Sequence, residues 1–344
     1  MPDYEAVLLV GFGGPESRDD VLPFLENVTR GRRVPRERLL EVAEHYYRFG
    51  GVSPLNDQVR AVKACLENDL ADRGISLPVY WGNRNWHPLL ADTMAEMAVA
   101  GVKRALAIVL SAYSSYSSCR QYLENLDEAR RVVGRNAPQV DKTRAFFNHP
   151  GFVGANVDCL REELNALDED SRRRVHVAFT AHSIPRVMAD GCCYEDQINE
   201  TSRLVAEACG VGSKRWQVVF QSRSGRPQDP WLGPDILDHL RSLDASGEDA
   251  VIVHPIGFLS DHLEVLFDLD VEAAGLAGEL QMTFRRAATV GVHPGFVGML
   301  GQLVEERCND SAERLTCGEM GPGDDVCPIG CCPSGQPGER TAKR

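Results

Sequence analysis

The chain has no excess of positive charge, since 37 Lys and Arg residues stand against 50 Asp and Glu residues and the formal net charge is −13. An acidic surface argues against DNA, RNA or an anionic membrane as the main partner, although a local basic patch could still bind an anionic small molecule. No apolar run approaches the ~20 residues that span a bilayer. The N-terminal stretch M-P-D-Y-E-A-V-L-L-V also lacks a basic region followed by a long apolar run. We therefore expect a cytoplasmic protein with no signal peptide, at most peripheral membrane contact and no nucleic-acid partner.

A nucleotide-binding motif and a disulfide framework are also missing. The first apolar run, residues 5–10, ends in the glycine-rich turn G-F-G-G-P at 11–15. This turn is not G-x-G-x-x-G and no Walker lysine follows it, so the glycines more plausibly admit a flat ligand or a packed helix. Eleven cysteines are many for a compartment in which disulfides are rare. Four of them lie in the last 36 residues, which points to a metal or a cluster.

The heptapeptide F-T-A-H-S-I-P at 179–185 is the first candidate for a functional site. It continues the apolar, β-branched run V-H-V-A at 175–178, which predicts a buried strand. Pro185 has no N–H for a sheet ladder and restricts the residue before it, so the strand ends close to His182. In open α/β sheets ligands bind at the carboxyl ends of strands, and an imidazole there can accept a proton or hold a metal. The alternative is a loop histidine that only hydrogen-bonds to the backbone.

A row of carboxylates follows the apolar run at 251–253. Glu264, Asp268 and Glu272 have the spacing i, i+4, i+8, which places them on one face of a predicted helix. Apolar residues flank them, so we expect this helix to be buried over much of its circumference. Buried carboxylates are usually paired or bind cations, whereas a solvated acidic face is the alternative interpretation.

The chain contains an internal repeat, because H-P-G-F-V-G occurs at 149–154 and again at 293–298. A length of 344 residues also exceeds the usual size of one hydrophobic core. We predict two similar α/β halves, each a four-stranded parallel sheet flanked by helices, with a ligand cleft between them. The predicted boundaries are 1–165 and 166–310, followed by a tail rich in cysteine, glycine and proline at 311–344.

Basic and aromatic residues in helices and loops between the predicted strands offer further binding candidates. Arg30 lies in the cluster R-G-R-R at 30–33, which could bind carboxylates by bidentate pairing or could be a solvated helix end. Tyr46 begins an aromatic loop that contains Ser53, although Ser53 could simply cap the next helix. Tyr122 closes a loop rich in tyrosine and serine, which could line a pocket or form a satisfied surface loop.

The tail supplies three thiols in close succession, Cys327, Cys331 and Cys332. A fourth thiol from Cys317 or from elsewhere would complete a set that suits zinc or an iron–sulfur cluster. The alternative is a disordered tail with reduced thiols, because such a composition cannot build a core of its own.

With these motifs the chain resembles the ferrochelatase family over about residues 4–310. The segments F-T-A-H-S-I-P, G-G-V-S-P-L and G-F-L-S-D-H-L-E-V-L-F-D-L-D carry the resemblance, and their order along the chain also fits. The similarity is greatest to the enzymes of actinobacteria and their relatives, which are regarded as coproporphyrin ferrochelatases. It implies two Rossmann-like domains of the chelatase type that insert Fe²⁺ into a porphyrin in haem biosynthesis, with no organic cofactor.

The resemblance also implies roles for single residues. His182 and Glu264 look like the iron-binding and catalytic pair, and we expect them to come from different halves and to face each other across the cleft. Asp268 and Glu272 would extend the metal path along the helix. Porphyrin contacts are implied at five positions: Ser53, Tyr122, Arg30, Tyr46 and Phe12. Some relatives have tyrosine where this chain has Phe12, which can pack on the ring but cannot bind its metal.

Several family members also carry a [2Fe-2S] cluster, held by one internal cysteine and three near the C-terminus. The resemblance implies Cys159, Cys327, Cys331 and Cys332 here, with Cys317 as a substitute because adjacent ligands are sterically tight. Such a cluster would be structural or regulatory, since metal insertion transfers no electron.

Other interpretations remain open from the sequence. The chain could load cobalt or nickel into another tetrapyrrole, or act as a non-enzymatic haem or redox sensor. Coproporphyrin III and protoporphyrin IX are not distinguished as substrates, and neither is the base within the His182–Glu264 pair. We expect a monomer, with other enzymes of the haem pathway as possible partners.

Overall fold

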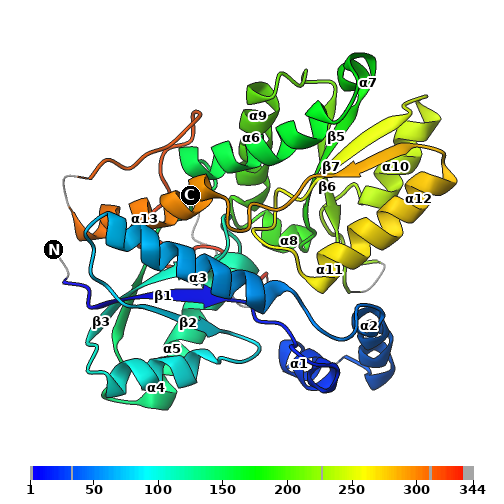
Figure 1. Cartoon of the computed structure of the whole chain (residues 1–344). Helices are drawn as coiled ribbons and strands as arrows, with labels where there is room; N and C mark the ends of the chain where they lie inside the picture. The colour runs from blue at the N-terminus through cyan, green and yellow to red at the C-terminus, as the bar shows by residue number, and fades with distance from the viewer. Residues whose placement is uncertain (1–2, 32–33, 226–227, 310–311, 336–344) are drawn as a thin grey trace.

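The computed structural model describes residues 3–31, 34–225, 228–309 and 312–335. It contains two four-stranded parallel sheets with the same topology, β2-β1-β3-β4 in the N-terminal half and β6-β5-β7-β8 in the C-terminal half (Figure 1). The strands are β1 (Ala6–Gly11), β2 (Val79–Asn83), β3 (Arg104–Val109), β4 (Gln139–Lys142), β5 (His176–His182), β6 (Trp216–Gln221), β7 (Ala250–His254) and β8 (Thr283–Arg286). The predicted fold class, two similar α/β halves, is confirmed.

Helices connect the strands because parallel neighbours cannot be joined by tight turns. The N-terminal half contains η1 (Arg18–Asp20), α1 (Val21–Val28), α2 (Arg36–Arg48), α3 (Leu55–Asp72), α4 (Leu90–Val99), the π-helix η2 (Tyr116–Arg120), α5 (Gln121–Val133) and α6 (Pro150–Asn165). The C-terminal half contains α7 (Glu169–Arg174), α8 (Arg186–Ala189), α9 (Tyr194–Ala208), α10 (Ile236–Ala245), α11 (Leu263–Val265), the π-helix η3 (Leu266–Ala273), α12 (Ala274–Glu279) and α13 (Pro294–Cys308). The central strand β1 is buried along its whole length, as expected for a parallel strand covered on both faces.

The last helix of each half packs against the other half. Helix α6 contacts α9 and β7, whereas α13 contacts α3 and β3, and the two helices also contact each other (Figure 1). Both begin with the repeated hexapeptide, and in each the histidine Nδ1 accepts a hydrogen bond from a glycine N–H, from Gly151 to His149 and from Gly295 to His293, both 3.1 Å long. The repeat therefore builds two equivalent helix starts at the crossing between the halves. The predicted domain boundaries stay a prediction.

Helices α1 and α2 form a small hydrophobic cluster of their own around Val21, Phe24, Leu25 and Ala43, separate from the main core. This pair of helices reaches beneath the start of α11 in the C-terminal half (Figure 1). Glycines at 50 and 51, both with positive φ, lead from the end of α2 into the chain before α3. The N-terminal half thus extends a helical pair toward the strand ends of the other half.

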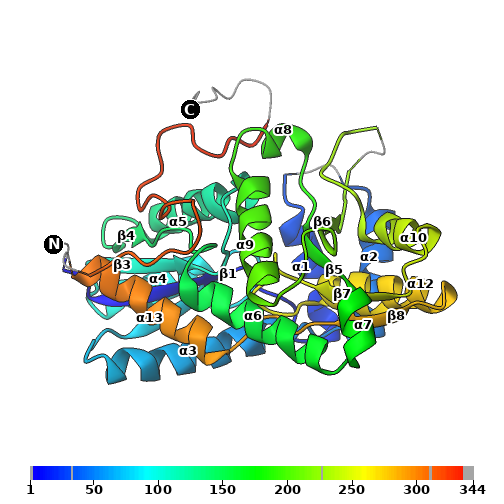
Figure 2. The ribbon, with the colours of Figure 1, turned by 90° about the horizontal axis from the view of Figure 1, so that it is seen from above.

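The described part of the tail is tied to the body of the protein. Arg144 and Glu306 form a fully buried ion pair of 2.8 Å, and the same guanidinium donates to the carbonyl of Leu315. Farther along, the Cys317 N–H donates to the carbonyl of Asn148 at 2.7 Å. Figure 2 shows the tail passing from α13 over the N-terminal half toward α8. At its end Pro333 lies against Gly191, just beyond α8.

Across the described ranges, no helix combines the length and the apolar character needed to cross a membrane.

Candidate active site

His182 and Glu264 lie together, with 3.8 Å between Nε2 and Oε1. His182 is the last residue of β5, where the following Pro185 ends the sheet ladder, and Glu264 lies in α11 at the start of the predicted acidic helix. Both side chains are partly exposed, by 39% and 44%, so a bound molecule can reach them. The expectation that they come from different halves is wrong. Both belong to the C-terminal half, because α11 follows β7 of the same sheet as β5.

The acidic segment is a π-helix where the sequence predicted an α-helix. Residues 266–273 are wound this way between the α-helical turns α11 and α12, and π-helical turns often lie at functional sites. Asp268 lies within it, close enough to Glu264 for the two charges to interact, and burial followed by this neighbour raises the pKa of Asp268 to about 7. Burial also raises the pKa of Glu272, with Asp235 adding to the shift. The row thus holds carboxylates with different tendencies to keep a proton.

The N-terminal half faces this row with α2. Tyr46 lies near Glu264, and the pKa of its phenol is raised by burial first and by that carboxylate second. The residue before it, His45, stacks on Phe267 of the π-helix with ring centroids 3.8 Å apart. Gln58 also accepts a hydrogen bond from the Asp261 N–H at 3.0 Å. The active-site wall is therefore made of both halves, although the imidazole and the carboxylates come from one.

Arg84 packs over the rings of both Phe12 and Tyr122, with its guanidinium carbon 5.7 Å and 4.9 Å from their centroids. Phe12 packs edge-on against Phe24 of α1. Phe12 is 39% exposed, so its ring presents an aromatic surface to solvent. Arg84 is not among the site residues predicted from the sequence. Its position directly after β2, at the carboxyl edge of the sheet, was the signal that could have identified it.

Two further expected porphyrin contacts, Ser53 and Arg30, differ in their exposure to solvent. Ser53 is 4% exposed and donates its N–H to the carbonyl of Pro15, so it packs against the glycine-rich turn. A Cβ at Gly14 would lie 2.8 Å from the Ser53 hydroxyl, which explains why the turn needs glycine there. Arg30 is exposed just after α1, and its neighbours Arg32 and Arg33 lie outside the described residues.

The structure brings Cys119, from the π-helix η2, to the three tail cysteines. Cys331 and Cys332 have their sulfurs 3.4 Å apart, and the thiols of Cys119 and Cys331 donate to Cys327 and lower its pKa. These four side chains line a cavity of about 260 Å³. Among the described residues, no three His, Cys, Asp or Glu side chains are arranged as ligands of a single metal ion.

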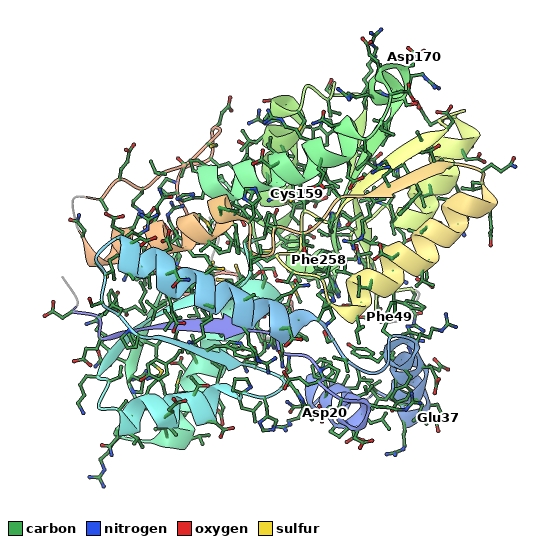
Figure 3. The ribbon with its side chains drawn as sticks, viewed as in Figure 1. Asp20, Glu37, Phe49, Cys159, Asp170 and Phe258 are labelled. Carbon is green, nitrogen blue, oxygen red and sulfur yellow. The ribbon has the colours of Figure 1, made fainter. Side chains whose placement is uncertain are left out.

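Cys159, the internal ligand implied by resemblance, is not among the residues that line this cavity. It lies on α6 toward the middle of the molecule (Figure 3), and its thiol donates to the carbonyl of Thr289 at 4.0 Å. Burial raises its pKa to about 11. Cys317 is also absent from the cavity lining and is held at Asn148.

Two parallel sheets of one topology, the second with a histidine and a row of carboxylates at its strand ends, have the fold of known chelatases. The crystal structure of the sirohydrochlorin chelatase SirB from Bacillus subtilis subspecies spizizenii in complex with cobalt has the same fold, with a TM-score of 0.51. Its sequence is 12% identical, and the alignment covers 91% of this chain and 99% of that one. At this identity the likeness concerns the fold alone.

Sequence comparisons give the particular family. A family model described as Ferrochelatase matches residues 4–308. The chain is 53% identical over 333 residues to a ferrochelatase from Rhodopirellula baltica, covering 96% of this chain and 94% of the relative. It is 50% identical over 364 residues to a coproporphyrin III ferrochelatase from Streptomyces coelicolor, covering 98% and 97%. The chain belongs to the ferrochelatase family and is a metal chelatase, a lyase that inserts Fe²⁺ into a porphyrin in haem biosynthesis.

Proposed function

We propose that the porphyrin substrate is coproporphyrin III and that His182 and Glu264 carry out the insertion. The observation that carries the catalytic assignment is the 3.8 Å approach of these two side chains at the open ends of the C-terminal strands. The substrate assignment rests on relatives that bear this name and match almost the whole chain. Coproporphyrin III carries two more carboxylates than protoporphyrin IX, and cationic side chains such as Arg30 and Arg84 suit such groups.

Insertion must remove two pyrrole protons and strip water from Fe²⁺. The pair can divide this work, because an imidazole accepts protons near neutral pH and a carboxylate binds a hard cation or relays protons. Nitrogen and oxygen ligands hold Fe²⁺ less tightly than thiolates do, which favours its release to the ring. We propose that Asp268 and Glu272 bring the cation to Glu264 along the π-helix.

The porphyrin would lie against the aromatic surface of the N-terminal half. We propose that Phe12 packs on the ring, that Tyr46 and Tyr122 border it, and that Arg30 binds a propionate. Ser53, buried against the glycine-rich turn, would act through its backbone and by fixing that turn. Arg84 joins this set because it packs over the rings of both Phe12 and Tyr122.

The catalytic assignment is tested with His182→Ala. Loss of a general base typically lowers the rate about 10²- to 10⁴-fold, so we expect iron insertion to fall by at least about a hundredfold while porphyrin binding, followed by absorbance, survives. His87→Ala is the matched control, because its side chain is 65% exposed beyond β2. Turnover retained by His182→Ala would remove the histidine from the mechanism. Parallel assays with coproporphyrin III and protoporphyrin IX test the substrate, and equal kcat/KM values would contradict the preference.

We also propose a resident [2Fe-2S] cluster bound by Cys119, Cys327, Cys331 and Cys332. Four thiols around one cavity are the ligand set that such a cluster needs. Lys142 is buried beside them and favours the thiolate form of Cys327, which offsets the negative charge of a thiolate site. The cluster would supply structural support rather than chemistry, because no electron is transferred in metal insertion.

Visible absorbance tests the cluster and separates the two candidates for its internal ligand. The purified protein should be brown, with iron and acid-labile sulfide in equal amounts. Cys119→Ser should abolish the colour, whereas Cys159→Ser, a substitution of a cysteine outside the cavity, should keep it. Loss of colour in Cys159→Ser alone would restore the set implied by resemblance, and a colourless zinc protein would exclude the cluster.

We further propose a cytoplasmic monomer with the domain boundaries 1–165, 166–310 and 311–344, and with at most peripheral membrane contact. Gel filtration and cell fractionation test the state and location. Pull-down experiments with other haem-pathway enzymes test for partners.

A further inference from the structure

Two side chains at the end of β6 converge on one oxygen of Asp268. The Gln221 amide donates to Oδ2 at 3.2 Å, and the Ser222 hydroxyl donates to the same atom. Because both donors bind Oδ2, they fix the orientation of the carboxylate without occupying Oδ1. Gln221 is paired with His182 in the sheet register, so the strand that holds the carboxylate is next to the strand that presents the histidine.

The backbone at this point is unusual. Ser222 has φ = 60°, a left-handed conformation that non-glycine residues seldom adopt outside caps and turns. Residues with such strained backbone gather at functional sites. Gln221 is 1% exposed, and its Oε1 is buried without a hydrogen-bond partner in the described part of the chain. A left-handed backbone at Ser222 and an unpaired buried oxygen of Gln221 thus occur where these two side chains hold Asp268.

We propose that Ser222 and Gln221 are positioning residues for iron delivery, which aim the free oxygen of Asp268 at Glu264. The inference rests on the proposed role of Asp268 in carrying the cation. With this left-handed backbone the Ser222 hydroxyl donates to Asp268, and the amide of Gln221 restrains rotation of the carboxylate. Without these donors Asp268 can turn away from Glu264, and Fe²⁺ loses a ligand on its way to the histidine.

The experiment compares Ser222→Ala, Ser222→Gly and Ser222→Asn in the full chain. Glycine adopts φ near 60° without strain, so Ser222→Gly removes the hydroxyl and keeps the turn. Loss of a hydrogen bond to a charged group should raise the KM for Fe²⁺ about tenfold in both Ser222→Ala and Ser222→Gly. The KM for porphyrin should not change, because the aromatic surface lies in the other half. Ser222→Asn should restore much of the iron KM, since asparagine tolerates this backbone and carries an N–H donor.

A second readout avoids turnover altogether. Calorimetric titration with Co²⁺, without porphyrin, should show weaker binding in Ser222→Gly, while the Tm stays within a few degrees of the wild-type value. An unchanged iron KM in Ser222→Gly, or an equal loss for both substrates together with a lower Tm, would reduce Ser222 to a structural contact and overturn the inference. Asp268→Ala separates the two levels of the argument. If that variant leaves the iron KM unchanged, the proposed delivery path fails; if it raises the KM and Ser222→Gly does not, only the positioning role fails.

Discussion

Asp268 shows how a single residue of the site opposes stability. Its carboxyl has a pKa of about 7, raised from 3.8 mainly by burial. A raised carboxyl pKa means that the folded state prefers the neutral acid. Its contribution to stability is therefore complete below pH 3.8 and is lost as pH rises through about 7. At neutral pH and above, the protein folds against the preference of this group.

Asp268→Asn should therefore unfold at higher denaturant concentration than the wild type at pH 8. We expect a gain of roughly 1–3 kcal/mol in the free energy of unfolding, a value reduced for the partial exposure of the side chain. The gain should shrink as pH falls from 8 to 5, because the wild-type acid becomes protonated. Asp238→Asn is the control, since that side chain is 73% exposed and its substitution should change little. A variant no more stable than the wild type at pH 8 would contradict the assignment of this cost.

The positions of some site residues could be predicted from the sequence, and those of others could not. The position of His182 was predictable, because a strand-end motif places it at the edge of a parallel sheet. Glu264 was placed on a helix by its spacing from Asp268 and Glu272, and beside His182 only by the resemblance. The position of Cys119 was not predictable, because nothing near it in the sequence indicates that the tail returns to meet it. That contact depends on tertiary anchors such as the Arg144–Glu306 pair, which unite segments far apart in the chain.

At the scale of elements, periodicity predicted the acidic helix but not its winding. The spacing of Glu264, Asp268 and Glu272 places them on one side in an α-helix, and it does not distinguish a π-helix from it. Side-chain spacing indicates that a segment is helical. Whether its backbone hydrogen bonds follow the α or the π pattern depends also on packing, such as the stacking of His45 on Phe267. The starts of α6 and α13 illustrate the opposite case, because the repeated hexapeptide begins a helix with the same cap both times.

The crossing of α6 and α13 gives a prediction for these elements. A Cβ at Gly151 would lie 2.6 Å from the carbonyl of Gly295 and 2.8 Å from the side chain of Met299, so Gly151→Ala must push the two helices apart. Overpacking of this kind typically costs about 1–3 kcal/mol. Gly154→Ala lies one turn along the same helix, with open space around it, and should be neutral or stabilising by up to about 1 kcal/mol. Denaturant unfolding of both variants measures the difference, and equal stabilities would show that the crossing tolerates a wider separation.

For the whole molecule, the internal repeat predicted two halves with one topology. It could not predict that each half sends its last helix to the other, because both helices carry the same sequence signal whichever sheet they cover. Nor could it assign both His182 and Glu264 to one half. That assignment follows from the chain order of β5, β7 and α11, and the N-terminal half contributes α2 and the aromatic surface instead. Figure 3 shows Phe258, from the loop after β7, at the junction of the two halves.

Buried histidines distributed over both halves make the whole fold sensitive to acid. Burial lowers the pKa of His149 and of His176 to about 4, and that of His254 to about 3, from 6.5. They lie at the start of α6, at the start of β5 and at the end of β7. A histidine with a lowered folded pKa contributes stability that is complete above pH 6.5 and is lost as pH falls toward the folded value. All three residues are buried in the folded protein, so each resists protonation there.

We therefore expect the free energy of unfolding to fall as pH drops from 6.5 toward 4. At pH 5 each of these histidines should already have lowered it by about 2 kcal/mol. Denaturant titrations at pH 7.5, 6 and 5 measure this slope. His254→Asn should flatten it, because asparagine does not titrate and can still meet Asn156, whose Oδ1 lies 2.9 Å from the imidazole. His87→Asn, at an exposed site, should leave the slope unchanged. A wild-type stability that is constant from pH 7.5 to 5 would mean that the buried imidazoles do not set the acid limit, and that water or a structural opening solvates them before the core unfolds.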